Sequence, residues 1–145
     1  MQNLTADQII SRLDLQPHPE GGFYRQTWIA SGHETGRSVG TSIYFLLKDG
    51  GSSHWHKVDA TEIWHYYAGA PLVLSRSETD HGPATDDILG PDIGEGQSPQ
   101  LIVPEHHWQA ARTLGAWTLV GCTVSPAFEF DAFTLAPPGF DIPRL

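Results

Sequence analysis

The sequence is poor in sulfur, in positive charge and in long hydrophobic runs. Among its 145 residues there is one cysteine, Cys122, which excludes an intrachain disulfide and a zinc cluster built on several thiolates. One cysteine is typical of a chain in a reducing compartment, so we expect a cytoplasmic protein.

Eight lysines and arginines are set against 17 aspartates and glutamates, which gives a formal net charge of -9. Because the basic residues are scattered, nucleic acid and anionic membranes are not expected as partners. The longest uninterrupted apolar run, from Ile43 to Leu47, is far shorter than the ~20 residues of a membrane helix. The first residues also lack the basic start and apolar core of a targeting peptide.

What the chain has instead is glycine and proline, with 15 of the first and 11 of the second. Such a composition indicates short elements joined by tight turns. Only residues 5–14 have the pattern of a helix, because Thr5 and Gln8 form a capping box and apolar residues then repeat at helical spacing. Pro17 should follow the end of that helix.

Beyond the helix the apolar pattern changes to a period of two, which is typical of strands. We expect strands at 23–29, 38–47, 52–58, 62–67, 72–77, 99–103 and 117–124, with further short ones near 87–89 and within 128–135. The length favours one domain, residues 1–145, and the regular short strands favour an all-β sandwich or barrel, here spanning about 20–140.

Six of the eight histidines fall between positions 54 and 107, and the densest group is followed by a carboxylate. On a regular strand His54 and His56 point to the same face, and an antiparallel return would bring Glu62 beside them. Two imidazoles and a carboxylate suit a divalent metal such as Zn, Ni, Fe or Mn. Taken alone, a His-x-His pair is more often two solvated side chains, and Gln109 is available as a fourth ligand near the start of a later strand.

The spacing of these residues resembles the first cupin motif, from His54-x-His56 through Glu62 to Gly69, and Pro104 with Gln109 lies where the second motif is expected. More narrowly, the chain is similar to a cupin subfamily described as a domain of unknown function. The similarity is carried by Pro19–Tyr24, Thr41–Leu47, His56–Gly69 and Leu119–Pro126. The chain departs from the general pattern in having five residues between His56 and Glu62, and Gln109 in place of a histidine.

The resemblance implies a small jelly-roll barrel that binds ligands inside its mouth and forms a homodimer. If Glu62 points inward, strand alternation also turns Trp64 and Tyr66 inward, while His65 faces outward. Together with Tyr44, these two aromatic residues are candidate contacts for a small polar, sugar-like molecule, and core packing is the alternative for each.

Two other features have plainer interpretations. The sequence Glu20-Gly21-Gly22 after Pro19 is more often a simple turn than a loop that approaches a ligand. Cys122 lies in an apolar run and is expected to be a buried hydrophobic residue.

Three functions remain open. The first is an isomerase, epimerase or lyase acting on a sugar-like molecule, with a metal at His54, His56 and Glu62 polarising a carbonyl. The second is a barrel that binds a small ligand without turnover. The third is a metal-dependent oxygenase, and the fold alone does not decide among them.

Overall fold

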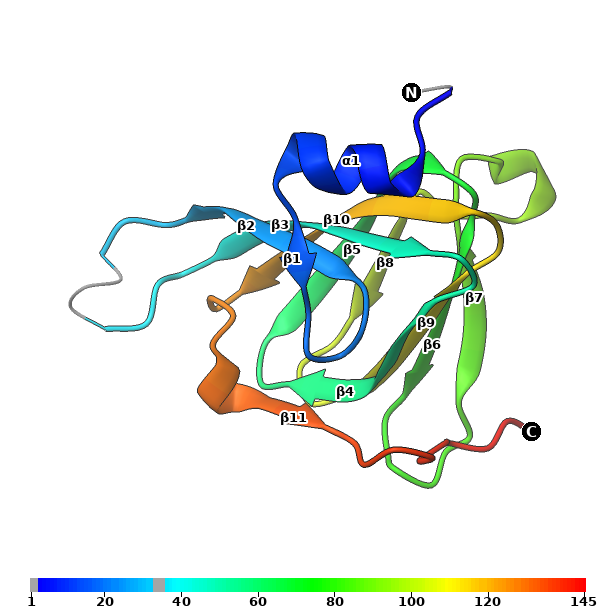
Figure 1. Cartoon of the computed structure of the whole chain (residues 1–145). Coiled ribbons are helices and arrows are strands. Elements are labelled where there is room, and N and C mark those ends of the chain that lie inside the picture. Colours follow the sequence, from blue (N-terminus) through cyan, green and yellow to red (C-terminus); the bar gives the residue numbers. More distant parts are fainter. Residues whose placement is uncertain (1–2, 33–35) are drawn as a thin grey trace.

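Two antiparallel β-sheets face each other and enclose the interior of the molecule (Figure 1). The computed structural model describes residues 3–32 and 36–145. The first sheet has the strand order β1-β2-β3-β10-β5-β8 and the second has β11-β4-β9-β6-β7. This confirms the prediction of an all-β barrel of jelly-roll type with a short N-terminal helix.

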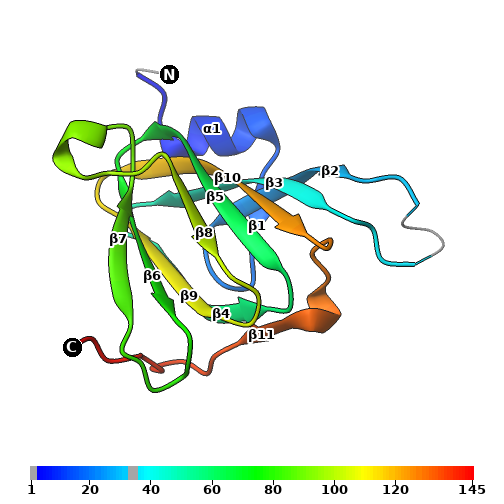
Figure 2. The same ribbon diagram turned by 180° about the vertical axis from the view of Figure 1, so that it is seen from behind.

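The strands of the first sheet are β1 (Gln16–Pro17), β2 (Phe23–Ile29), β3 (Thr41–Lys48), β5 (Thr61–Gly69), β8 (Gln100–Val103) and β10 (Trp117–Ser125). Those of the second sheet are β4 (Ser52–Val58), β6 (Leu72–Ser77), β7 (Thr85–Leu89), β9 (Trp108–Thr113) and β11 (Phe133–Leu135). The short 3-10 helices η2 (Ile93–Glu95) and η3 (Phe130–Ala132) lie in the connections before β8 and before β11. Figure 2 shows β7 and β8 from behind, with the loop that joins them.

The N-terminal helix α1 (Ala6–Leu13) lies across the outer face of the first sheet (Figure 1). Its capping box is formed as predicted, with Thr5 accepting from the backbone of Gln8 and the Gln8 side chain accepting from the backbone of Thr5. Ile9 is buried in a cluster with Leu46 of β3. No helix in the described part of the chain is long and apolar enough to cross a membrane.

The sequence pattern predicted no range for strand β9, nor for the two-residue strand β1. The inward positions of β9 hold Gln109, Ala111 and Thr113, which are buried but not strongly hydrophobic. The alternation of hydrophobic and polar residues is therefore absent, although the alternation of burial is present.

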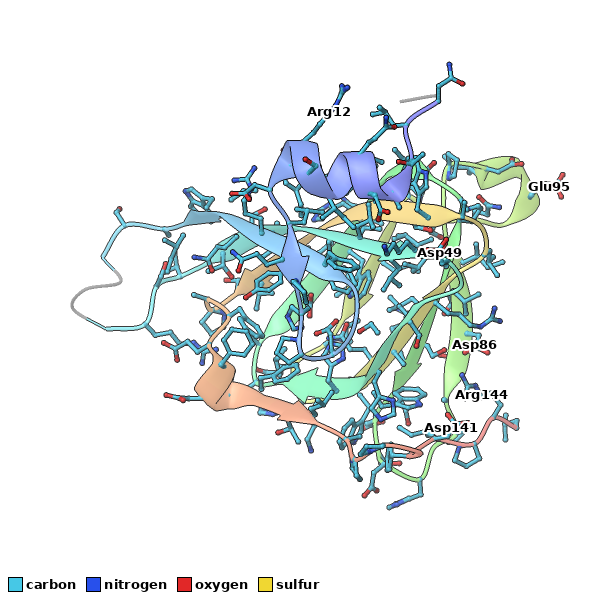
Figure 3. The ribbon with its side chains drawn as sticks, viewed as in Figure 1. Arg12, Asp49, Asp86, Glu95, Asp141 and Arg144 are labelled. Carbon is cyan, nitrogen blue, oxygen red and sulfur yellow. The ribbon has the colours of Figure 1, made fainter. Side chains whose placement is uncertain are left out.

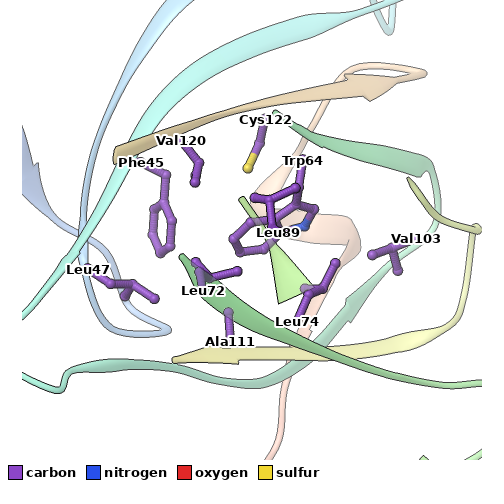
Figure 4. Close-up of a cluster of buried hydrophobic side chains, with 10 residues drawn as sticks. All are labelled: Phe45, Leu47, Trp64, Leu72, Leu74, Leu89, Val103, Ala111, Val120 and Cys122. Atoms are coloured by element: carbon purple, nitrogen blue, oxygen red, sulfur yellow. The ribbon is translucent and has the colours of Figure 1, made fainter. Parts of the chain in front are cut away.

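The hydrophobic core fills one end of the barrel, between the two sheets (Figure 4). Phe45 packs edge to face on Trp64 with ring centroids 5.7 Å apart, and aliphatic side chains surround them. The buried members are Phe45, Leu47, Trp64, Leu72, Leu74, Leu89, Val103, Ala111, Val120 and Cys122.

A β-bulge in β4 changes which side chains face the interior. Ser53 pairs with Ala111 and His56 pairs with Gln109, so three steps along β4 match two along β9. As a result Ser53 and His56 are both buried, and Trp55 packs in a separate cluster with Ile142 near the C-terminus. The expectation that His54 and His56 share one face is therefore wrong, because it assumed an unbroken period of two.

Candidate functional site

A cavity of about 220 Å3 lies between the sheets, at the end of the barrel that the hydrophobic core does not fill. Strands β3, β4, β5 and β10 form its walls, and the segment before β11 contributes two phenylalanines. The ionisable residues that line it are His18, Glu20, Tyr24, His56, Glu62 and Cys122. Aromatic rings that also line it are Phe45, Trp64, Phe128 and Phe130.

Glu20 reaches the cavity because the loop between β1 and β2 passes very close to β4. A Cβ atom at Gly21 would lie 2.2 Å from the carbonyl oxygen of Ser52, and its φ of 110° also favours glycine. The backbone N–H of His54 donates to the carbonyl of Glu20 at 2.8 Å and ties the loop to the strand. The glycine pair thus forms a turn, as expected, and also places a carboxyl group inside the barrel.

The carboxyl group of Glu20 lies between two imidazoles. Its Oε1 atom is 3.3 Å from His56 Nε2 and 3.4 Å from His18 Nδ1, while Oε2 accepts a hydrogen bond from the hydroxyl of Ser53. His56 Nδ1 is 2.7 Å from the carbonyl oxygen of His54, so this nitrogen carries the proton and Nε2 has a free lone pair. His18 Nδ1 accepts from the backbone N–H of Glu20 at 3.2 Å, so its lone pair is engaged there and it donates no proton to Oε1.

This arrangement favours a protonated Glu20, because Oε1 faces the free lone pair of His56 Nε2 and receives no proton from His18. Burial raises the pKa of Glu20 to about 8, and the hydrogen bond from Ser53 opposes that change. Burial also lowers the pKa of His18 to about 4, with the His56 charge adding to the effect. The pKa of His56 is lowered as well, mainly by burial. Near neutral pH the proton of this group therefore belongs to the carboxyl.

Glu62 has the opposite surroundings, because donors face its carboxyl group. Gln109 Nε2 donates to Glu62 Oε1 at 2.9 Å, and the thiol of Cys122 provides a second hydrogen bond. Burial is the main influence and raises the pKa of Glu62, while His56 and these hydrogen bonds counteract it. Burial raises the pKa of both carboxyl groups, but their surroundings differ, since Glu20 Oε1 faces an imidazole acceptor whereas Glu62 accepts from two donors.

Gln109 is oriented by the indole of Trp64. The Trp64 N–H donates to Gln109 Oε1 at 2.8 Å, and because an indole nitrogen only donates, the amide oxygen must lie on that side. The amide N–H groups of Gln109 therefore point toward Glu62. This gives Gln109 a role in positioning Glu62, whereas a metal would need the amide oxygen that Trp64 already occupies.

The structure separates the four predicted metal ligands. His56 and Glu62 line the cavity, but His54 Nε2 is 2.9 Å from the carbonyl oxygen of Pro137 and its ring lines a different depression near the C-terminus. Among residues 3–32 and 36–145, no three His, Cys, Asp or Glu side chains come together as a metal site. His56 Nε2, the nitrogen that a metal would take, is directed at Glu20. The residues as arranged do not fit the predicted metal centre.

Of the three aromatic candidates, Trp64 alone lines the cavity in the described structure. Tyr44 is on the opposite face of β3 from Phe45 and packs near α1, so the expectation that it lines the interior is wrong. Tyr66 does pack on the core, but its hydroxyl donates to the carbonyl of Gly69 at 2.7 Å, toward the other end of β5. His65 faces outward, as predicted, with its Nε2 atom 3.0 Å from the hydroxyl of Thr123.

Sequence reasoning missed His18 and Glu20 as members of this site. The available signal was Glu20 directly before two glycines, because a simple exposed turn does not need two glycines in a row. Phe128 and Phe130 were also missed, because their segment has no regular period and is held by tertiary contacts with His18.

Comparison with known proteins identifies the family. A family model described as "Cupin superfamily (DUF985)" matches residues 7–136. The chain belongs to this cupin family. The resemblance inferred from the His56–Gly69 block is thereby confirmed, and no curated protein matches this cupin.

Solved structures similar to this cupin include two of undescribed function. Protein SO0799 from Shewanella oneidensis is 38% identical over 92% of this chain and 85% of its own, with a TM-score of 0.85. A hypothetical protein from Leishmania major is 30% identical over 94% of this chain and 90% of its own, with a TM-score of 0.82. Oxalate decarboxylase from Bacillus subtilis is 13% identical over 85% of this chain and 30% of its own, with a TM-score of 0.64, which shows a shared fold.

Proposed function

We propose that this cupin binds a small polar, sugar-like molecule in the cavity and moves a proton on it, as an isomerase or epimerase does. The observation that carries the proposal is the contrast between Glu20 and Glu62, two buried carboxyl groups of one cavity in opposite hydrogen-bonding environments. Such pairs divide the tasks of acid and base between them.

Glu62 is the base in this scheme. Hydrogen bonds from Gln109 and Cys122 oppose the rise in pKa that burial causes, and the ionised form that they stabilise can accept a proton from a carbon next to a carbonyl group. Glu20 is the acid, because it holds a proton near neutral pH and can donate it to the substrate. General acid and base groups typically contribute about 10²–10⁴-fold each to a rate.

His56 connects the two carboxyl groups. It contacts Glu20 through Nε2, and a proton on its ring would interact with the charge of Glu62. After Glu20 has given its proton to the substrate, His56 Nε2 can take a proton from water and pass it to Glu20 Oε1, 3.3 Å away, while Glu62 releases to water the proton that it took from carbon. The bond from His56 Nδ1 to the carbonyl of His54 keeps the ring in the orientation that this requires.

Catalysis by a metal is the alternative that the fold suggests, since the oxalate decarboxylase of Bacillus subtilis has Mn(II) centres. At 13% identity that enzyme supports only the fold. Here the predicted ligands His54 and Gln109 do not present ligand atoms to His56 and Glu62. We therefore favour acid and base catalysis by the chain's own residues over a metal-dependent reaction such as that of an oxygenase.

The experiment that tests the proposal is hydrogen exchange on a substrate panel. Free aldoses, ketoses and amino sugars are incubated with the protein in D2O, and deuterium at carbon is detected by proton NMR. We expect the wild type to catalyse exchange, and we expect the exchange rate to fall by ~10²-fold or more in Glu62→Gln and in Glu20→Gln. Glu95→Gln, on the loop before β8, removes an acid far from the cavity and should exchange like the wild type (Figure 3).

The outcome also separates enzyme from binding module. If sugars shift the NMR signal of the Trp64 indole N–H but none exchanges, the cavity binds without turnover and the catalytic part of the proposal is wrong. If exchange requires added Mn²⁺ or Zn²⁺, the metal alternative replaces the acid and base scheme.

A further inference from the structure

The cavity offers no positive charge to a ligand. Within the described chain, no lysine or arginine lines it, although two glutamates do. Its two imidazoles are held neutral near pH 7 by burial, which lowers the pKa of both His18 and His56. Any charge that the interior carries is therefore negative.

The basic residue tied to the cavity rim is already paired. Arg37 donates to the carbonyl of Ala127, next to the lining residue Phe128, and binds both carboxylate oxygens of Asp59 at 2.7 and 2.8 Å. Glu129 lies 3.5 Å from the same guanidinium. With the formal net charge of -9, the field around the entrance repels anions and attracts cations.

Aromatic rings form the wall that a ligand would meet. Phe128 and Phe130 pack edge to face with centroids 4.8 Å apart, and Tyr24 also lines the cavity. Phe130 lines the cavity and is also 49% exposed, so its ring lies where the cavity meets the surface. The faces of such rings attract ammonium groups, and carboxyl groups beside them add to this attraction.

From these features we infer that the ligand carries a positively charged amine or ammonium group, held between Glu62 and the aromatic wall. The inference rests on the proposed function only in that the cavity binds a small molecule. It excludes small carboxylates and phosphorylated sugars, since each would place a like charge beside the ionised Glu62. An amino sugar combines the polar body proposed above with the required charge.

Matched sets of compounds that differ in charge test this directly. One set is glucosamine, glucose and glucuronate, and a second is benzylamine, benzyl alcohol and benzoate. Binding to the EDTA-treated protein is measured by calorimetry and by the NMR shift of the Trp64 indole N–H, which hydrogen-bonds inside the site. We expect the amine to bind at least about tenfold more tightly than the alcohol, and no binding of the carboxylate.

Other binding patterns would contradict the inference. An alcohol that binds as tightly as its amine, or a carboxylate that binds at all, overturns it and leaves the proposed function intact. If no member of either set shifts the Trp64 signal, the small-molecule function fails and the inference fails with it.

Two variants locate the effect. Glu62→Gln keeps a carbonyl oxygen to accept from Gln109, so the fold should persist while the amine loses its advantage over the alcohol. Glu95→Gln makes the same change in net charge on the exposed loop before β8 and should change neither affinity. If Glu95→Gln weakens amine binding as much as Glu62→Gln does, the general field of the molecule is responsible and the inference is wrong.

Discussion

Glu20 is the residue on which most of the chemistry depends, and its neighbours explain why it stays protonated. The lone pair of His56 Nε2, the ring of His18 and the hydroxyl donor of Ser53 surround a carboxyl group that is buried. A buried carboxyl without a positive partner is more stable in its neutral form. The same surroundings make the stability of the whole chain depend on pH.

Stability should fall as pH rises from 6.5 to 8. The pKa of Glu20 is raised from 4.5 to about 8, so within this window the folded state keeps a proton that the unfolded state has released. When unfolding releases one such proton, the free energy of unfolding falls by up to about 1.4 kcal/mol for each pH unit. Below pH 6.5 the lowered pKa of His18 acts in the opposite direction, because the unfolded histidine then binds a proton that the folded one does not.

Urea unfolding at pH 6.5 and 8 measures this slope. Glu20→Gln removes the titrating group, so the fall in unfolding free energy should become smaller than in the wild type. Equal slopes in the two proteins would show that Glu20 does not hold a proton in this range.

The elements β4 and β5 show what the sequence could and could not predict. Strand parity placed Glu62 and Trp64 inside and His65 outside, because β5 is regular over those residues. In β4 the same reasoning failed at His54, since nothing in the pattern Ser-His-Trp-His marks the extra residue of the bulge. The contribution of Glu20 depends on contact between distant segments, which periodicity does not report.

The loop between β1 and β2 depends on Gly21, and this can be tested. Gly21→Ala places a methyl group against the Ser52 carbonyl in addition to the cost of a positive φ. Gly96→Ala has a φ of 84° and meets no atom within 4 Å, so it measures the backbone cost alone, about 1–2 kcal/mol. We expect Gly21→Ala to lower the unfolding free energy by more than Gly96→Ala does, as measured by urea titration. We also expect it to weaken ligand binding, as measured by calorimetry. Equal losses would mean that the loop shifts without strain.

For the molecule as a whole, α1 covers part of the outer face of the first sheet, and exposed apolar side chains lie on the rest of it. Trp28, Tyr67 and Ile102 are each half exposed there, at 54%, 50% and 50%. Exposed apolar side chains at this density are typical of an interface, and symmetric dimers are the commonest use of such a surface. We therefore predict a homodimer, with a mass by light scattering of twice the 15.9 kDa of one chain.

A substitution on this face should separate the subunits without unfolding them. Trp28→Ser removes the largest exposed ring and should shift the measured mass toward the monomer, whereas Ile93→Ser, an exposed apolar residue on η2, should not. A wild-type mass of one chain at micromolar concentration would contradict the prediction.

The proposed mechanism depends on the different protonation of the two buried glutamates, and NMR titration of the carboxyl carbons measures that difference. With 13C-labelled glutamate, the signal that is missing from Glu20→Gln belongs to Glu20, and its chemical shift reports protonation. We expect this carboxyl to titrate near pH 8, as burial between two imidazoles requires. A midpoint near the 4.5 of an ordinary glutamate would rule out Glu20 as the acid and, with it, the proposed mechanism.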